Sequence, residues 1–283
     1  MAGSALFPNL RAISFDFGNT LVPVGGPSLA AVVDQMISTI VTELGGLDPA
    51  DFARTWAEER DRQFAEDVPR LREVDLDRRV VRVLARLRGM PAPPASLPWD
   101  DVAAGRRSSS TEIDVAVDAY SRAFVALVHV PTEVGPLLER LAARFDLAVL
   151  SNWPLASTID TYVEAAGWRP FLRAVVVSQR VGTIKPDPRI FQVAETALGV
   201  AGQAILHVGD DWAADIVGAK RAGWRAAYLR DRQAGSPLPS SSPDSSVRSD
   251  LEIDSLAELE AALALARARL TARLAGGWSR ATA

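Results

Sequence analysis

The chain has 283 residues, no cysteine and a formal net charge of −4. Without cysteine it can carry neither thiol redox chemistry nor thiolate zinc sites, and we expect a cytoplasmic location. The slightly acidic balance and the lack of a long basic run argue against nucleic acid as the main partner. No apolar run approaches the roughly 18 residues of a membrane span, and the first residues lack the pattern of a secretory signal. Small molecules are therefore the expected partners.

Five short apolar runs predict the strands of a parallel sheet. They cover residues 12–17, 147–150, 174–177, 205–208 and 226–229. Helical patterns lie between the later strands, over residues 155–166, 188–198 and 213–222. Strands that alternate with helices form right-handed βαβ units, so we expect an α/β fold with a Rossmann-like parallel sheet. Polar side chains that follow these strands should meet at the carboxyl edge of the sheet, where ligands bind in such folds.

The first two predicted strands are separated by about 120 residues without a strand pattern, which is too long for a simple crossover. We expect an all-α insert there, built as a bundle of four helices. Its last helix should begin with a capping box of Thr111 and Asp114. The predicted organisation is an α/β core of residues 10–24 and 130–275, with a helical domain of residues 25–129 inserted in it.

Two stretches have the composition of flexible linkers. Residues 90–110 are rich in proline, serine and arginine, and residues 231–250 contain the run SPLPSSSPDSS. Such compositions offer too little apolar surface to offset the entropy of ordering the chain. We expect residues 231–250 to form a flexible linker in the C-terminal part of the core, and we assign no function to either stretch.

Four sequence motifs follow one another along the predicted core: ISFDFGNTLV, AVLSN, GTIKPDPRIF and ILHVGDDWAADIVGAKRAGW. In the first, Asp16 ends a strand, and an aspartate carboxylate can attack phosphorus to form an acyl phosphate that water later hydrolyses. In the third, Lys185 is one of only two lysines in the chain. A fixed cation stabilises the negative charge that develops on a transferring phosphoryl group. We predict Asp16 and Lys185 as the catalytic residues.

Other side chains of these motifs offer polar groups to a phosphate and a cation. Thr20 and Ser151 carry hydroxyls and Asn152 an amide, which we predict as ligands of the phosphate oxygens, although such residues also serve in turns and caps. Asp210 and Asp211 follow a predicted strand. Because Mg²⁺ takes carboxylates together with phosphate and water, these residues suit a phosphate ester bound with a divalent cation.

The ordered set of motifs resembles the haloacid dehalogenase superfamily over residues 12–229, and the helical insert is similar to the cap that some members carry after the first motif. The resemblance implies a hydrolase that binds Mg²⁺ through Asp16, the backbone carbonyl of Gly18 and Asp210. It also implies that Asp211 or Asp215 assists the metal directly or through water. For these last two residues the other interpretation is N-capping of the following helix.

Gly18 departs from the family pattern, because most phosphatases of the superfamily carry a second aspartate there. That aspartate protonates the leaving group and later activates water, and such a group contributes roughly 10² to 10⁴ in rate. We therefore expect a phosphatase for small-molecule phosphomonoesters that either have good leaving groups, such as sugar 1-phosphates or acyl phosphates, or receive their proton from the cap or from water.

Two other interpretations remain open. A 2-haloacid dehalogenase would use Asp16 on carbon without a metal, but Asp210 and Asp211 would then repel an anionic substrate. A degenerate, non-catalytic phosphate-binding protein would account for Gly18, but it would not need a nucleophile together with a metal ligand. Metal dependence and turnover distinguish the three interpretations.

Overall fold

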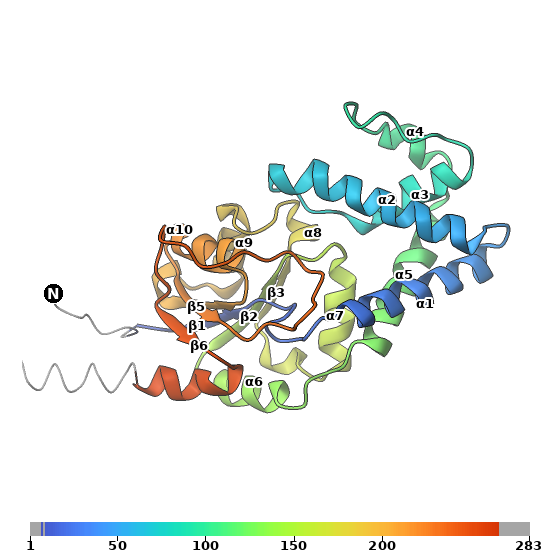
Figure 1. The fold of residues 1–283 in the computed structure, drawn as a ribbon. Coiled ribbons are helices and arrows are strands. Elements are labelled where there is room, and N and C mark those ends of the chain that lie inside the picture. Colours follow the sequence, from blue (N-terminus) through green and yellow to red (C-terminus); the bar gives the residue numbers. More distant parts are fainter. Residues whose placement is uncertain (1–6, 8, 266–283) are drawn as a thin grey trace, which may run out of the picture.

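A six-stranded parallel sheet forms the centre of the computed structural model, which describes residue 7 and residues 9–265 (Figure 1). The strands lie in the order β3-β2-β1-β4-β5-β6. They are β1 (Ala12–Phe15), β2 (Asp146–Ser151), β3 (Ala174–Val177), β4 (Ile205–Gly209), β5 (Arg225–Leu229) and β6 (Leu251–Ile253). The predicted α/β fold with a Rossmann-like parallel sheet is confirmed. The sequence pattern does not predict β6, because that strand has only 3 residues.

Helices cover both faces of the sheet. They are α6 (Val134–Ala142), α7 (Ala156–Ala165), α8 (Ser178–Val181), α9 (Pro188–Leu198) and α10 (Gly218–Arg221). Side chains alternate along each strand, so Ile13 and Val149 belong to the hydrophobic cluster that includes α6 and α7, whereas Ala12 and Leu150 belong to the cluster that includes α9 and α10. Burial on both faces explains why the strands read as continuous apolar runs.

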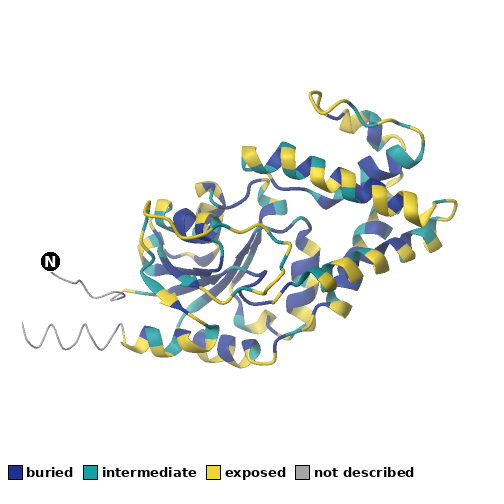
Figure 2. Ribbon diagram, viewed as in Figure 1, coloured by how far each residue is buried: buried dark blue, intermediate teal, exposed yellow. Residues whose placement is uncertain are grey.

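The chain between β1 and α6 is helical and lies to one side of the sheet (Figure 1). Its elements are α1 (Gly26–Leu44), α2 (Pro49–Asp67), the 3₁₀ turn η1 (Val68–Arg70), α3 (Leu76–Leu87), α4 (Asp101–Gly105) and α5 (Ser110–Leu127). Helix α1 packs on α5, α2 on α3, and α5 on α7 of the core. Buried and exposed residues alternate along the long helices, so each turns one side inward (Figure 2).

The predicted capping box of α5 was wrong by two residues. Ser109 is the N-cap, and its hydroxyl accepts from the Glu112 N–H at 3.3 Å. Oε2 of Glu112 accepts from the Ser109 N–H at 2.8 Å in return. The pairs Ser109/Glu112 and Thr111/Asp114 both have the three-residue spacing of a capping box. The longer side chain of Glu112 reaches the N-cap more easily than that of Asp114 would.

An aromatic cluster joins the helical insert to the core beside the carboxyl ends of the strands. Phe124 of α5 lies 5.1 Å from Trp153 and 5.7 Å from Tyr162, measured between ring centroids. Phe17 lies 5.8 Å and 5.3 Å from the same two rings. Edge-on aromatic contacts each contribute about 0.5–1.5 kcal/mol beyond the area they bury, so this cluster helps to hold the insert next to Asp16.

Beyond β5 the chain forms neither helix nor strand through residues 231–250, here called the post-β5 segment. Figure 1 shows it passing in front of the sheet toward the start of α1. The predicted core boundary at residue 275 lies outside the described residues. Among the helices that the structure describes, none combines the length and the apolar character needed to cross a membrane.

Candidate active site

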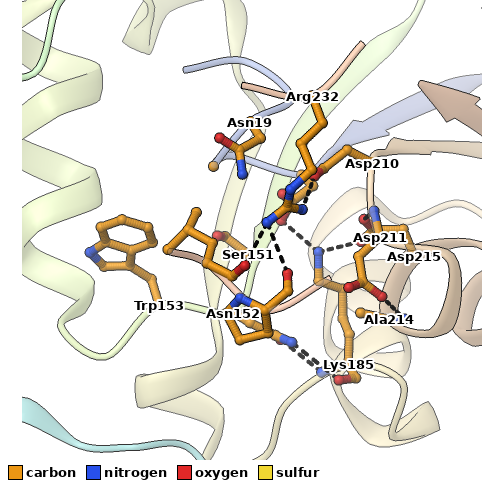
Figure 3. A pocket seen from close by; sticks show the side chains of 14 residues that line it. Asn19, Ser151, Asn152, Trp153, Lys185, Asp210, Asp211, Ala214, Asp215 and Arg232 are labelled. Carbon is orange, nitrogen blue, oxygen red and sulfur yellow. Dashed lines mark hydrogen bonds and ion pairs between the residues drawn. The ribbon is translucent and has the colours of Figure 1, made fainter. Parts of the chain in front are cut away.

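Three chain segments bring the predicted residues together at the carboxyl edge of the sheet (Figure 3). Asp16 follows β1 and Asp210 follows β4, two neighbouring strands whose register pairs Phe15 with Val208. Lys185 comes from the loop between α8 and α9, and its Nζ lies 2.6 Å from Oδ1 of Asp16. Since the strand order reverses between β1 and β4, these residues lie where parallel sheets bind their ligands.

Lys185 is buried and fully hydrogen-bonded. Its ammonium donates to Oδ1 of Asp16 at 2.6 Å, to Oδ1 of Asp215 at 2.7 Å and to the Leu150 carbonyl at 2.8 Å. Burial alone would lower the pKa of Lys185, but the carboxylates of Asp16 and Asp215 raise it above its ordinary value. Lys185 is therefore charged at neutral pH, with all three N–H groups in use.

Asp215 lies in the π-helical turn η4 (Trp212–Val217), and both of its carboxylate oxygens are occupied. Oδ1 accepts from Lys185 and lies 3.0 Å from Nε2 of His207, while Oδ2 accepts from the Asp211 N–H at 2.9 Å. Burial would raise the pKa of Asp215, but Lys185 and His207 hold it below its ordinary value. Asp215 is therefore an ionised counter-charge that positions Lys185.

Gly209 allows this close packing at the end of β4. A Cβ atom at position 209 would lie 2.2 Å from Cγ of Asp215, closer than side chains approach one another. The helix predicted over residues 213–222 is in fact two elements, η4 and then α10. π-helical turns are frequent at functional sites, and this one carries Asp215.

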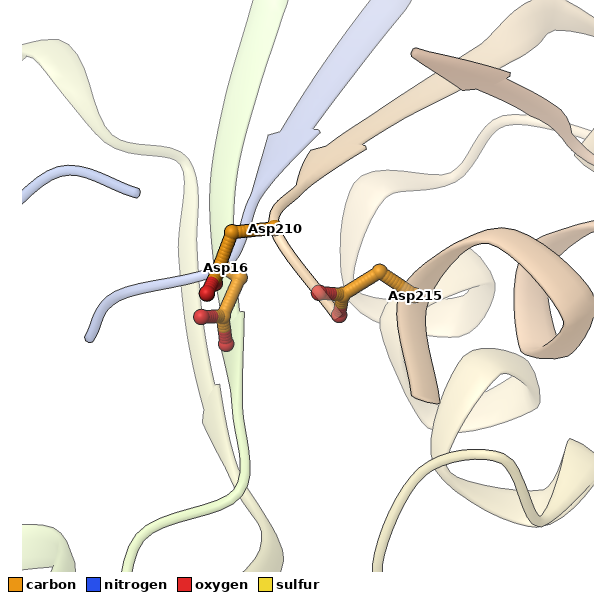
Figure 4. A group of neighbouring side chains, drawn as sticks. All are labelled: Asp16, Asp210 and Asp215. Atoms are coloured by element: carbon orange, nitrogen blue, oxygen red, sulfur yellow. The ribbon is translucent and has the colours of Figure 1, made fainter. Parts of the chain in front are cut away.

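Asp16, Asp210 and Asp215 form a compact group of carboxylates (Figure 4). One oxygen of each lies within 4.8 Å of the others. Burial, together with neighbouring carboxylates, raises the pKa of Asp16 to about 8 against the opposing effect of Lys185, and that of Asp210 to about 6. A divalent cation between Asp16 and Asp210 would stabilise both ionised forms, and an all-oxygen site suits Mg²⁺.

The three residues predicted to bind phosphate oxygens have different surroundings. Ser151 lines the pocket beside Lys185, and its hydroxyl forms no hydrogen bond within the part of the chain that the structure describes. Asn152 also lines the pocket, but its side chain is bound to the backbone of Lys185. Its Oδ1 accepts from the Lys185 backbone N–H at 2.7 Å, and its Nδ2 donates to the Lys185 backbone carbonyl at 3.1 Å. Thr20 donates to Oδ1 of Asp210 at 3.3 Å. Asn152 and Thr20 therefore position Lys185 and Asp210, whereas Ser151 has a hydroxyl available for a ligand.

Asp211 is the N-cap residue of η4. Its Oδ1 accepts from the Ala214 N–H at 2.8 Å and from the Ser241 hydroxyl at 2.7 Å. These contacts agree with the capping interpretation of Asp211. A metal-assisting role for this residue stays a prediction, as does metal binding by the carbonyl of Gly18, which lines the pocket.

The post-β5 segment contributes residues that the sequence does not predict for the site. Arg232 and Leu238 line the same pocket as Asp16. Arg232 forms an ion pair with Asp210 through Nη1 and Oδ2. Arginine is the common basic residue of this chain, and the segment has the composition of a linker, so no signal in the sequence distinguishes Arg232.

The fold and the site agree with a known family. A family model for haloacid dehalogenase-like hydrolases matches residues 10–223, which contain the first three motifs and all but the last residue of the fourth. The chain belongs to this family. The resemblance inferred from the motifs is confirmed, and the chain is a member of a hydrolase family.

Similar proteins include both phosphatases and dehalogenases. Phosphoserine phosphatase of Thermus thermophilus is 42% identical over 79 residues, which are 28% of this chain and 31% of that protein. Glyceraldehyde 3-phosphate phosphatase of Methanopyrus kandleri is 30% identical over 148 residues, which are 52% of this chain and 62% of that protein. (S)-2-haloacid dehalogenase of Pseudomonas sp. strain YL is 36% identical over 99 residues, 35% of this chain and 42% of that protein. The chain spans less than two thirds of each of these relatives.

Solved structures of the family share the whole fold. A 2-haloacid dehalogenase from Pseudomonas syringae pv. Tomato has a TM-score of 0.63 at 25% identity, with 90% of this chain and 98% of that chain covered. A phosphatase of the family from Thermococcus onnurineus has a TM-score of 0.55 at 18% identity with the same coverage, which supports the fold alone. One fold thus carries both chemistries, and the choice between them depends on the residues of the site.

Proposed function

We propose that the chain is a Mg²⁺-dependent phosphatase that hydrolyses a small-molecule phosphomonoester through an aspartyl phosphate on Asp16. The observation that carries the proposal is the cluster of three carboxylates, from Asp16, Asp210 and Asp215, that lies beside Lys185. These charges suit a divalent cation with a phosphate, but they would repel an organic anion that arrived without a cation. Phosphatases among the relatives are in line with this proposal.

The proposed reaction has two steps. A carboxylate oxygen of Asp16 attacks phosphorus, and the ester oxygen leaves with the bonding electron pair. Water then attacks the aspartyl phosphate, which releases inorganic phosphate and restores the carboxylate. Lys185 lies 2.6 Å from Asp16 and balances the charge of the phosphoryl group, while the Ser151 hydroxyl donates to one of its oxygens. Mg²⁺ held by Asp16, Asp210 and the Gly18 carbonyl would supply Lewis-acid polarisation of the phosphoryl oxygens.

Gly18 restricts the proposed substrate, because it offers no acid to the departing oxygen. The leaving group must be stable as an anion or take its proton from water, as the leaving groups of sugar 1-phosphates and acyl phosphates can.

We further propose that residues 25–129 act as a cap that closes over the site and excludes water. The lack of cysteine supports a cytoplasmic location.

Phosphate release from a panel of phosphomonoesters, with Mg²⁺ or with EDTA, tests the proposal. We expect turnover only with Mg²⁺, and most turnover for acetyl phosphate and sugar 1-phosphates. Asp16→Asn should lower turnover by about 10³ or more, because an amide is a much weaker nucleophile than a carboxylate. Asp34→Asn, an exposed position on α1, is a matched control that should keep full activity. Unchanged phosphate release from Asp16→Asn would contradict the mechanism.

The same preparation tests the two other interpretations. The dehalogenases among the relatives make halide release from a 2-haloacid the natural comparison. Halide release that persists in EDTA, without phosphate release from any ester, would favour attack on carbon. Phosphate binding with Mg²⁺ but no turnover of any ester would favour a non-catalytic binding protein.

A further inference from the structure

The post-β5 segment is attached to the active site at several points. Nδ2 of Asn19, three residues after the predicted nucleophile, donates to the Ser236 hydroxyl at 3.0 Å. The Ser241 hydroxyl accepts from the Ala213 N–H at 2.6 Å and donates to Oδ1 of Asp211 at 2.7 Å. Asn19 and Asp211 both line the pocket, so the segment is anchored to pocket-lining residues. The segment therefore forms one wall of the site.

Leu238 of this wall lies against Gly18. A Cβ atom at position 18 would meet Cδ1 of Leu238 at 2.6 Å and Trp153 at 3.5 Å. In the proposed function the phosphoryl group lies next to Asp16 and Lys185, which are themselves in contact at 2.6 Å, so the remainder of a substrate extends toward the rest of the pocket lining. That lining includes Trp153, Leu238 and Arg232, which therefore face the leaving group.

Arg232 is the cation of this wall, and it is held in one orientation. Nη2 donates to the Leu238 carbonyl at 2.6 Å and to the Pro239 carbonyl at 3.2 Å, and Nη1 pairs with Oδ2 of Asp210. Within residues 9–265 these are the hydrogen bonds that Arg232 donates, so two of its five N–H groups remain for another acceptor. A guanidinium fixed in this way is well suited to bind a planar or tetrahedral anion.

Lys185 and Arg232, two cations of the pocket lining, therefore have different roles. All three N–H groups of Lys185 are used by Asp16, Asp215 and the Leu150 carbonyl. Arg232 is the pocket-lining cation with donors left over, and 21% of its side chain is exposed. Asp210 can serve both Arg232 and a metal, because a carboxylate has two oxygens with several lone pairs.

We propose that Arg232 is a specificity-determining residue that binds an anionic group on the leaving part of the substrate. The site would then select phosphate esters whose leaving group carries a second negative charge, such as a carboxylate. This inference rests on the proposed phosphatase function of the same site. It extends that function by naming the substrate class and the residue that selects it.

Binding of two matched probes tests the proposal independently of turnover. The probes are 4-carboxyphenyl phosphate and its methyl ester, which differ in one negative charge remote from phosphorus. Binding is measured by titration calorimetry on Asp16→Asn with Mg²⁺ at saturation, with and without Arg232→Gln or Arg232→Lys. Arg230→Gln is the matched control, because Arg230 pairs with Glu252 and Asp254 outside the pocket lining.

We expect the carboxylate probe to bind roughly 10- to 100-fold more tightly than the methyl ester, as a charged hydrogen bond would give. Arg232→Gln should abolish this preference, Arg232→Lys should keep part of it, and Arg230→Gln should leave it unchanged. An unchanged preference in Arg232→Gln would overturn the proposal. Equal weakening of both probes would also overturn it, since that is the effect of a structural role in holding the segment.

The outcome also separates this inference from the proposed function. If the carboxylate preference depends on Arg232 but the unmutated chain releases no phosphate from either probe, the phosphatase function is wrong and the binding role of Arg232 stands. If both probes are hydrolysed at the same rate, with or without the carboxylate, the phosphatase function stands and the proposed role of Arg232 is wrong. If neither probe binds to Asp16→Asn, both are wrong.

Discussion

His207 donates from Nε2 to Oδ1 of Asp215 over 3.0 Å, to the same oxygen that accepts from Lys185. Burial lowers the pKa of His207, so the ring is neutral at pH 7 and can accept from the Ser14 hydroxyl at Nδ1, 3.1 Å away. The imidazole is a fully buried side chain of β4 and is not part of the pocket lining. It acts on the site through Asp215, as a positioning residue.

The first prediction follows from this contact. His207→Leu should lower the free energy of unfolding by about 1.5–3 kcal/mol, because a buried carboxylate loses a donor. It should also lower kcat more than it raises KM, since Asp215 no longer fixes Lys185 opposite Asp16. Urea unfolding and steady-state kinetics measure the two effects. Ser14→Ala is the control, because it leaves the bond to Asp215 intact. Equal unfolding midpoints for His207→Leu and the unmutated chain would contradict the argument.

The second prediction concerns the missing acid at Gly18. Gly18→Asp alone should give little activity on poor leaving groups, because its carboxyl group would be placed against Leu238 and deprived of water. The tip of a leucine can rotate, so Gly18→Ala should fold normally. Gly18→Asp combined with Leu238→Ala should raise turnover of alkyl phosphates, toward the roughly 10² to 10⁴ of a general acid. Equal rates for the single and the double variant would show that Leu238 does not block this position.

For physical reasons, the sequence predicts the sheet and the meeting of the motif residues at its carboxyl edge. Strands buried on both faces leave a strong apolar signal, and Asp16 and Asp210 follow two of them directly. The post-β5 segment is different. Its serine and proline content predicts a flexible linker, and Arg232 reaches Asp210 through a tertiary contact that has no periodic pattern in the sequence. The same holds for the contact of Ser241 with Asp211, whose donor and acceptor lie 30 residues apart in the chain.

The third prediction separates the roles of two adjacent carboxylates. Mg²⁺ at 100 times its Kd should stabilise the chain by about 2.7 kcal/mol, which thermal unfolding can detect. Asp210→Asn should weaken Mg²⁺ binding by at least about tenfold, because it removes a charge next to Asp16. Asp211→Asn should change it by less than about threefold, since asparagine keeps the N-cap of η4. A larger effect of Asp211→Asn than of Asp210→Asn would show that Asp211 contacts the metal.

The fourth prediction is a pH dependence of stability that comes from Glu73, between η1 and α3. Oε1 of Glu73 accepts from the Val74 N–H at 2.8 Å, and Oε2 accepts from the Ser178 hydroxyl in the core. Burial raises the pKa of Glu73 above its ordinary value of 4.5, although both hydrogen bonds oppose the shift. The folded chain therefore holds this proton more tightly than the unfolded chain. The contribution of Glu73 to stability is complete below pH 4.5 and declines as the pH rises through its folded pKa.

Glu73→Gln should remove this decline, because glutamine keeps an acceptor for the Val74 N–H and, like the protonated carboxyl group, places an uncharged donor next to the Ser178 hydroxyl. The free energy of unfolding of the variant minus that of the unmutated chain should therefore be larger at pH 8 than at pH 5. Urea unfolding at both pH values measures this difference. Glu112→Gln is a control of opposite sign. Hydrogen bonds from Arg88 and Ser109 lower the pKa of Glu112 to about 2, so its ionised form stabilises the fold and its loss should cost more at pH 8 than at pH 3. If Glu73→Gln behaved like Glu112→Gln, Glu73 would be ionised in the folded chain and would stabilise the junction between insert and core as an anion.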